Sequence, residues 1–386
     1  MARKKKKEAE EAAEALSEED LIDAIVKKVD GAEILDENTL LQQGFINTTN
    51  LALNYICSGH FLNGGVPKGR ITQIYGPSSS AKTVIGTHIL QGCQQTGGIA
   101  ALLDSESAYS PSFSSALGID NKKLVYLQPD HLEGCFSRAR DIAMMVSQKG
   151  DKRPVAVVYD SIAASPSARE FNDMMEGNEE PKPEMGERAR VCSRELRKLA
   201  ALLNKLNCSL VVINQIRMKI GVMYGNPETT AGGGNSLEFY CSLMLDCRRG
   251  KAILDAKKRP IGILVNVKCT KNKCYKPFGK VSNLRLYWDY GIDPCSGLLN
   301  VLIDAERLQA GSPGWYHLAT DPEVKFQAKK DDNYVPKEFL LEHPEVVDAT
   351  KEELEKFLGC NSRALEKAEE ETSFVADSES DEEAEE

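Results

Sequence analysis

A glycine- and serine-rich segment has the composition of a phosphate-binding turn. Its residues are Gly76, Pro77, Ser78, Ser79, Ser80, Ala81, Lys82 and Thr83. In such a turn, successive backbone N–H groups converge on phosphate oxygens, and the following helix adds the positive end of its dipole. Lys82 can then reach the β- and γ-phosphates, and the hydroxyl of Thr83 can ligate Mg²⁺. The segment therefore predicts a P-loop that binds a nucleoside triphosphate.

Ala81 stands where the usual pattern, G-x4-G-K-[ST], has its second glycine. If this position needed a positive φ, the side chain would cost about 1 kcal/mol or more. Because Lys82 and Thr83 open a helix, we expect Ala81 to have helical backbone angles already, where alanine is at no disadvantage to glycine. We accordingly expect Ala81→Gly to change ATP turnover little.

From residue 70 onward, patterns typical of strands alternate with patterns typical of helices. The expected strands are 71–75, 99–103, 124–127, 155–159 and 209–214, and the expected helices are 83–95, 132–148 and 187–206. This alternation predicts an α/β fold of βαβ units with a mostly parallel sheet that is buried on both faces. In such sheets the ligand lies at the carboxyl ends of the strands.

Three polar residues follow these strands and could serve the phosphate site. Asp160 ends a buried apolar strand, which suits a carboxylate that holds the Mg²⁺ shell, although an Asp that caps a helix is the alternative. Glu106 could orient or deprotonate the attacking water, or it could be an ordinary surface residue. Gln215 follows the next apolar strand and precedes a long glycine-rich segment, 216–236, which we expect to be an irregular functional loop.

The chain divides by composition into four parts. Residues 1–45 are expected to form a helical arm with a helix over 8–28, which either contacts a partner in oligomerisation or is a solvated arm. Residues 46–293 are expected to form the ATPase core, 294–362 a small α+β domain with helices near 298–305 and 351–358, and 363–386 a disordered acidic tail. The last 22 residues hold eleven acidic residues and one lysine, whereas the other 364 hold 47 of each sign. The body of the chain is therefore balanced in charge and can carry local basic patches for a polyanion.

Cysteine usage and the chain's ends indicate the compartment. Eleven cysteines without a CxxC pair, and five scattered histidines, favour a reducing compartment over a disulfide framework or a structural metal site. No apolar run reaches about 18 residues, and the basic start is not followed by an apolar segment. We expect a cytoplasmic protein of a bacterium or of a phage that acts there.

The run Gln215–Tyr240 closely resembles the second DNA-binding loop of bacterial RecA recombinases. The P-loop, the segment Leu103–Glu106, the strand end Tyr159–Ser161 and the run Lys271–Lys273 follow in the order of that family. The resemblance covers roughly residues 45–320, and the acidic tail is also similar. It implies a RecA-like P-loop ATPase core with a mostly parallel central sheet, flanked by an N-terminal helical segment and a small α+β C-terminal domain.

The resemblance assigns roles in ATP binding and hydrolysis. Lys82 and Thr83 would bind phosphates and Mg²⁺, Glu106 would be the base for water, and Asp160 would be the Walker B carboxylate that holds Mg²⁺ through water. Gln215 would sense the γ-phosphate, and Lys271 and Lys273 would reach the γ-phosphate of the adjacent subunit. Phe113 matches the aromatic that stacks on adenine, with Phe in place of the usual Tyr. Ser110 replaces an Asp that contacts the adenine edge, which weakens the expectation of strict adenine preference.

The resemblance also assigns residues to DNA. The first DNA loop, near 178–192, and its following helix would contribute Met185, Arg190, Ser193 and Arg197. The second, near 216–236, would contribute Arg217, Ile220, Tyr224, Gly232, Gly233 and Asn235. Single-strand binders need cations, backbone N–H groups and apolar wedges between bases, and this set supplies all three. For Arg190 and Arg197, seven residues apart on one helix face, a solvated stripe is the alternative.

These features imply an ATP-dependent DNA recombinase with ATP and Mg²⁺ as cofactors. It would polymerise on single-stranded DNA and catalyse homologous pairing and strand exchange, with DNA-stimulated ATP hydrolysis. Its partners would be single-stranded DNA, homologous duplex DNA, further copies of itself in a helical filament, and single-strand-binding and loader proteins. The alternatives are a hexameric helicase with a RecA-like core and a weakly hydrolysing recombination mediator, which Ala81 keeps open. Ala81, Ser110 and the extra glycine in 232–234 would suit a phage-encoded branch or a divergent bacterial one.

Overall fold

A computed structural model of the 386-residue chain describes residues 17–30, 44–177, 186–218, 228–230, 235–328 and 333–360. The chain divides into two units, residues 1–42 and 43–386. The first contains helix α2 (Glu18–Lys28), whose start is capped by the side chain of Ser17. Leu21, Ile22 and Ile25 on this helix are exposed. The expected helix over 8–28 is confirmed for 18–28, and residues 8–16 lie outside the described part.

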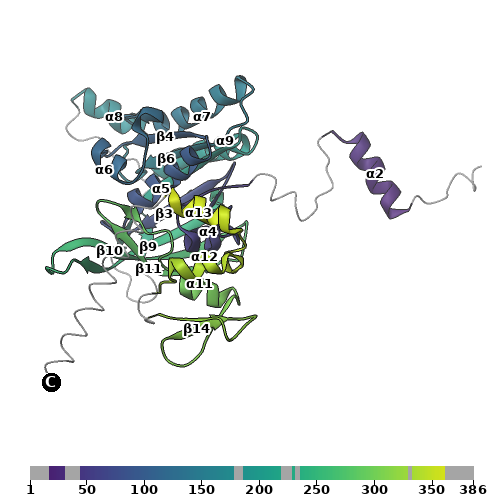
Figure 1. Cartoon of the computed structure of the whole chain (residues 1–386). Coiled ribbons are helices and arrows are strands. Elements are labelled where there is room, and N and C mark those ends of the chain that lie inside the picture. The colour runs from purple at the N-terminus through teal and green to yellow at the C-terminus, as the bar shows by residue number, and fades with distance from the viewer. Residues whose placement is uncertain are drawn as a thin grey trace, which may run out of the picture. The chain divides into compact units, whose positions relative to one another are not determined.

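The second unit is built on one large sheet with the strand order β12-β11-β10-β9-β3-β7-β6-β4-β5 (Figure 1). Its parallel part comprises β9 (Leu243–Leu254), β3 (Ile71–Gly76), β7 (Cys208–Met218), β6 (Val155–Asp160), β4 (Ile99–Asp104) and β5 (Leu124–Leu127). Its antiparallel part adds β10 (Pro260–Asn272), β11 (Lys280–Tyr287) and β12 (Gly291–Ile292). The expected α/β fold with a mostly parallel sheet is therefore confirmed, whereas β10 and β11 were not among the predicted strands.

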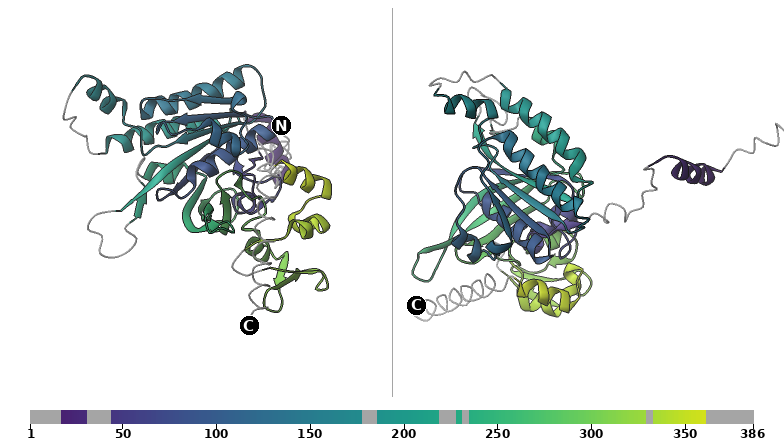
Figure 2. Two further views of the ribbon diagram at one scale, coloured as in Figure 1. Left: turned by 60° about the vertical axis from the view of Figure 1, so that its left-hand side comes forward. Right: turned by 90° about the horizontal axis from the view of Figure 1, so that it is seen from above.

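Side chains of the parallel strands alternate between two cores. Ile74, Val158 and Ile213 face one core, which includes residues of α5 (Lys82–Gln95), whereas neighbouring strand residues such as Val157 and Val212 face the other. The second core includes residues of α7 (Leu132–Gln148) and α9 (Glu187–Leu203). Because both faces are covered, β6 is buried along its whole length. Figure 2 shows the blue-to-teal helices α7 and α9 along one side of the sheet.

Parallel register brings the expected site to one edge of the sheet. Asp104 lies beside Asp160 across β4 and β6, and Gly76 lies beside Gln215 across β3 and β7. Four strand ends are thus adjacent, and the loops that carry Glu106 and the P-loop leave from the same edge. The prediction that these residues share the carboxyl ends of the strands is confirmed.

The segment 216–236 is more regular than predicted where the structure describes it. β7 continues to Met218 and pairs antiparallel with β8 (Glu228–Thr230), so that Arg217 lies opposite Thr229. Helix α10 (Asn235–Tyr240) follows. The expectation of an irregular loop is wrong for these stretches, because Ile216–Met218 alternates apolar and polar residues and Glu228–Thr230 has two β-branched threonines, both of which favour strands. Residues 219–227 and 231–234 lie outside the described part.

The C-terminal segment adds a three-stranded antiparallel sheet and short helices. The strands are β13 (Leu308–Ala310), β14 (Trp315–Leu318) and β15 (Lys325–Gln327), and the helices are α11 (Leu298–Asp304), α12 (Lys337–Glu342) and α13 (Lys351–Gly359). The helices expected near 298–305 and 351–358 are confirmed. All eleven cysteines are free thiols, nine of them buried. Within the described ranges, no helix has the length and apolar character that a membrane span requires.

Candidate active site

The expected P-loop connects the end of β3 to the start of α5. Gly76 is buried against the next strand, and an ideal Cβ there would lie 2.2 Å from the carbonyl oxygen of Cys247, so only glycine fits. Ser80 Oγ donates to the carbonyl oxygen of Pro77 at 2.8 Å, and Lys82 Nζ donates to the same oxygen at 2.6 Å. Pro77, Ser78 and Ser79 are exposed. The loop is therefore closed on itself by two side chains, with its middle open to solvent.

Ala81 has left-handed backbone angles, with φ 68° and ψ 17°. The expectation that it is already helical is wrong. The helix begins one residue later, at Lys82, and Ala81 is its N-cap without a side-chain hydrogen bond. The chain must turn from the strand into the helix while its N–H groups face inward, and alternating positive and negative φ is how such anion-binding turns are built. Ala81 is thus held in a left-handed backbone conformation, which its Cβ makes unfavourable.

Thr83 and Asp160 are brought together at the start of α5 and the end of β6. Thr83 Oγ1 donates to Asp160 Oδ2 at 2.5 Å. The pKa of Asp160 is raised to about 6, chiefly by burial; the charges of Glu106 and Asp104 act in the same direction, and Thr83 and Lys82 act in the opposite direction. Burial likewise lowers the pKa of Lys82. A hydroxyl and a poorly solvated carboxylate in contact are oxygen ligands of the kind Mg²⁺ prefers, so these residues fit that cation.

Glu106 is placed beside this pair by two hydrogen bonds. Ser161 Oγ donates to Glu106 Oε1 at 2.5 Å, and Gln215 Nε2 donates to the same oxygen at 3.3 Å. The peptide bond between Asp160 and Ser161 is cis. Ser161 is fully buried and was given no role from sequence, since a serine after a strand carries no distinctive signal. The structure thus joins Glu106 and Gln215, which the sequence separates by 109 positions.

Phe113 lies on α6 (Pro111–Ala116), which follows the loop that carries Glu106, and Ser110 directly precedes this helix. Ser110 caps this short helix, because its Oγ accepts the N–H of Phe113 at 3.4 Å. The Phe113 ring is 36% exposed. An exposed ring on a capped helix can offer a face for stacking, as the resemblance expects.

Lys271 and Lys273 lie at the other end of the central strands from the P-loop. The N–H of Lys273 donates to the carbonyl of Ser242, and the N–H of Ser242 donates to the carbonyl of Ile71, where β3 begins. Lys271 Nζ contacts the carbonyl oxygens of Glu238 and Phe239, and Lys273 Nζ lies 3.4 Å from that of Phe239. Both lysines therefore cap the carboxyl end of α10. Burial lowers the pKa of Lys271, and the charge of Lys273 lowers it further.

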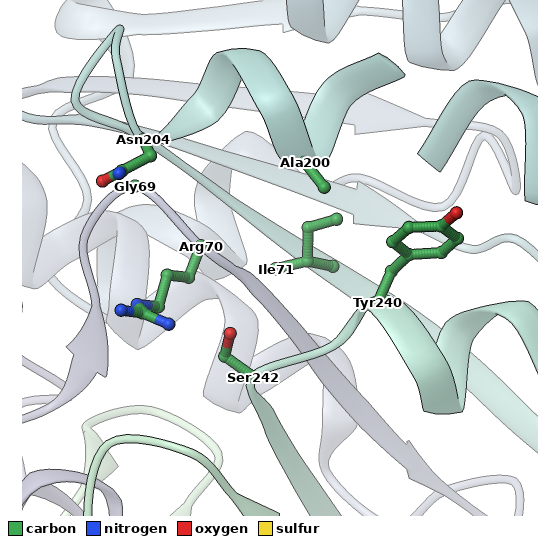
Figure 3. Close-up of a pocket in the computed structure, with 7 residues that line it drawn as sticks. All are labelled: Gly69, Arg70, Ile71, Ala200, Asn204, Tyr240 and Ser242. Atoms are coloured by element: carbon green, nitrogen blue, oxygen red, sulfur yellow. The ribbon is translucent and has the colours of Figure 1, made fainter. Parts of the chain in front are cut away.

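A cavity of about 190 Å³ opens at this same end of the sheet, between the ends of α9 and α10 (Figure 3). Its lining residues are Gly69, Arg70, Ile71, Ala200, Asn204, Tyr240 and Ser242. None of these was predicted as a site residue. The cavity lies at the amino end of β3 and is therefore separate from the expected phosphate site at its carboxyl end.

The expected DNA residues that the structure describes lie on α9 and β7. Arg190 and Arg197 are exposed on α9 and Ser193 is half-buried there, while Arg217 is exposed on β7. Gln215 and Arg217 are two residues apart on one strand, so a shift of Gln215 moves the strand that carries Arg217. Five other expected residues lie outside the described part: Met185, Ile220, Tyr224, Gly232 and Gly233. Asn235 begins α10, and its side chain is also outside it.

Arg248 forms an ion pair that the sequence did not indicate. Its guanidinium donates to both oxygens of Glu228 at 2.7 Å, and to Asp246 at 2.7 and 3.0 Å. These hydrogen bonds lower the pKa of Glu228 and raise that of Arg248. A bidentate pair of this geometry fixes orientation as well as charge. It ties β8, which lies within the segment 216–236, to β9 beside the P-loop strand.

Comparison with known proteins shows that this chain is similar to RecA proteins over most of its length. Residues 21–293 match the family model for the RecA N-terminal domain. Protein RecA of Thermus aquaticus is 36% identical over 315 residues, which are 81% of this chain and 85% of that protein. Protein RecA of Rubrobacter xylanophilus is 37% identical over 324 residues (84% and 87%), and that of Geobacter metallireducens is 38% identical over 284 residues (74% and 78%).

Proposed function

The chain belongs to the RecA family, and from that premise we propose that it is an ATP-dependent DNA recombinase. It polymerises on single-stranded DNA and catalyses homologous pairing and strand exchange, with DNA-stimulated ATP hydrolysis. The observation that carries the proposal is the hydrogen bond between Glu106 and Gln215. It links the carboxylate that would position water to the strand that continues into the second DNA loop.

ATP binds with its phosphates in the loop 76–83 and its base on Phe113. Lys82 would contact the β- and γ-phosphates, and Thr83 and Asp160 would hold Mg²⁺, which would neutralise charge on the phosphates. Glu106 orients the attacking water and accepts its proton. Ser161 supports this role, because its 2.5 Å hydrogen bond fixes one oxygen of Glu106 and leaves the other to face the water.

Gln215 couples the nucleotide to DNA. Its amide contacts Glu106 in the structure and would turn to the γ-phosphate when ATP is bound. Arg217 is two residues further along β7. The movement of Gln215 therefore shifts the paired strands β7 and β8 and orders the second loop, as in other nucleotide switches. Arg190, Ser193, Arg197 and Arg217 then contact phosphates, and Met185 and Ile220 separate stacked bases. Sequence is read by base pairing and not by the protein.

The filament forms by head-to-tail contact between copies, which does not close and so produces a helix. Lys271 and Lys273 lie at the amino end of β3, whereas the P-loop lies at its carboxyl end. They cannot serve their own P-loop from there, which supports their action on the ATP of the adjacent subunit. The exposed apolar face of α2 packs on that neighbour as well, so deletion of residues 1–30 should abolish filaments while the core stays folded.

The acidic tail, 363–386, competes with DNA for the basic surface. Its deletion should strengthen duplex binding. It should also reduce the Mg²⁺ and salt requirement, because cations are no longer needed to screen the negative charge of the tail. Unchanged duplex uptake by the truncated chain would count against this role.

The proposal is tested by ATP hydrolysis with and without single-stranded DNA, using Glu106→Gln as the inactive reference. We expect hydrolysis that rises with DNA in the wild type and is lost in the variant. Wild-type rates equal to those of Glu106→Gln would favour a mediator that binds ATP weakly. Closed rings on DNA in electron micrographs, in place of helical filaments, would favour the helicase alternative.

A further inference from the structure

Asp104 ends β4 with its carboxylate buried behind Glu106; the residue is only 3% exposed. Its Oδ1 accepts the backbone N–H groups of Glu106 at 3.1 Å and Ala108 at 3.4 Å. Its Oδ2 accepts the N–H of Tyr109 and the hydroxyl of Tyr126, both at 3.0 Å. A single carboxylate therefore receives four donors, three of them from the loop that carries the water-positioning residue.

We propose that Asp104 is a positioning residue for ATP hydrolysis, which holds Glu106 in place through the backbone of residues 106–109. This inference rests on the proposed function. Only a carboxylate can accept on both oxygens, because an amide of the same shape presents a donor on one side. In an Asp104→Asn variant, two of the four donors would then face the NH₂ group of the amide and lose their acceptor. The loop is also tightly turned, with a φ of 53° at Ser107, so its conformation depends on these hydrogen bonds.

Tyr126 connects this anchor to the neighbouring strand. It lies on β5, and its ring is 5.3 Å from that of Tyr109. Burial and the hydrogen bond to Asp104 together raise the pKa of Tyr126 to about 12, so the hydroxyl remains a donor at neutral pH. The edge strand thus donates to the same carboxylate oxygen, Oδ2, that accepts the N–H of Tyr109 from the loop.

The same loop reaches the expected adenine platform. The hydroxyl of Tyr109 donates to Asn121 Oδ1, and Asn121 Nδ2 donates to the carbonyl of Pro111 and to Ser115 Oγ, both at 2.8 Å. Pro111 and Ser115 belong to α6, which carries Phe113. One network therefore holds the catalytic carboxylate at one end and the base-stacking helix at the other.

Substitutions at the two ends of this network should have different kinetic effects. A small misplacement of a catalytic group costs up to about 100-fold in rate, and such a loss appears in kcat when substrate binding is unaffected. We expect Asp104→Asn to lower kcat about 100-fold and Tyr126→Phe to lower it about 3- to 10-fold, with the KM for ATP within about twofold. Asn121→Ala should instead raise the KM for ATP about 3- to 10-fold with a smaller effect on kcat.

The experiment measures kcat and KM of DNA-stimulated hydrolysis for the full chain and these variants, together with thermal unfolding. Asp151→Asn is the matched control, because Asp151 also accepts a backbone N–H, that of Arg153, but before β6 begins and away from the site. It should retain wild-type kinetics. Tyr126→Phe keeps the test decisive if Asp104→Asn does not fold, since it removes one hydroxyl from a ring that is 40% exposed.

Folded Asp104→Asn and Tyr126→Phe proteins with wild-type kcat would overturn the positioning role and leave the proposed function intact. Equal changes in kcat and in the folded fraction would also overturn it, because they would show a structural role alone. A wild-type chain that hydrolyses no ATP with DNA would instead overturn the proposed function.

Discussion

Replacing Ala81 with glycine should stabilise the protein, although alanine-to-glycine changes usually destabilise. The φ of 68° at Ala81 is left-handed, and that conformation costs an L-residue about 1–2 kcal/mol. Glycine removes this strain but adds about 0.4–1 kcal/mol of unfolded-state entropy to be lost on folding. Ala81 is also the N-cap of α5, where glycine is preferred to alanine. The net expectation is a gain of about 1 kcal/mol in the free energy of unfolding.

Urea unfolding of the Ala81→Gly variant measures this gain, with Ala200→Gly as the matched control. Ala200 lies inside α9 with ordinary helical angles, so its replacement should cost about 1 kcal/mol. The two variants make the same chemical change and should shift stability in opposite directions. Relief of strain in the loop can also lower the KM for ATP, by at most about fivefold, the equivalent of 1 kcal/mol. A loss of stability in Ala81→Gly as large as that in Ala200→Gly would refute the reasoning.

Three further predictions concern the site and its connections. The folded pKa of Asp160, about 6, lies above its ordinary 3.8, so the folded state binds more protons between these values and its stability falls as pH rises through that range. Asp160→Asn should abolish this slope and raise stability at pH 8, without Mg²⁺, by up to about 3 kcal/mol in urea unfolding; an unchanged slope would contradict the burial argument. Glu228→Gln should loosen the bond from Arg248 to β8 and speed amide hydrogen exchange in β8 about fivefold, whereas Asp246→Asn, which retains that bond, should speed it less; equal rates in both variants would contradict it. Lys271→Ala and Glu106→Gln subunits should each be inactive alone, but random mixtures should recover roughly a quarter of the wild-type hydrolysis if the lysine acts on its neighbour; no recovery in mixed filaments would contradict action between subunits.

The sequence was sufficient to predict that the candidate phosphate-site residues share one end of the sheet, because parallel sheets obey a simple rule. Strands that run in one direction end together, so the positions after 75, 103, 159 and 214 had to be neighbours in space. The hydrogen bond from Gln215 to Glu106 follows from this rule. Short apolar runs rich in β-branched residues, typical of strands buried on both faces, made the strands recognisable without knowledge of their partners.

What could not be predicted depended on contacts between distant residues. In the sequence, Asp104 is an ordinary polar residue at the end of a strand. Its proposed role follows only from the folded structure, in which Tyr126 and the loop N–H groups donate to its carboxylate. The positive φ of Ala81 is set by the path of the loop and not by its residue type. Arg248 meets Glu228 only because β7 extends beyond its apolar run and pairs with β8.

Strand exchange between homologous DNA molecules tests the central claim most directly. A circular single strand and a homologous linear duplex, incubated with the full chain, ATP and Mg²⁺, should yield joint molecules and then exchanged products. The reaction should fail without ATP and with a heterologous duplex. Robust DNA-stimulated ATP hydrolysis without any joint molecules would contradict the assignment of this chain as a recombinase.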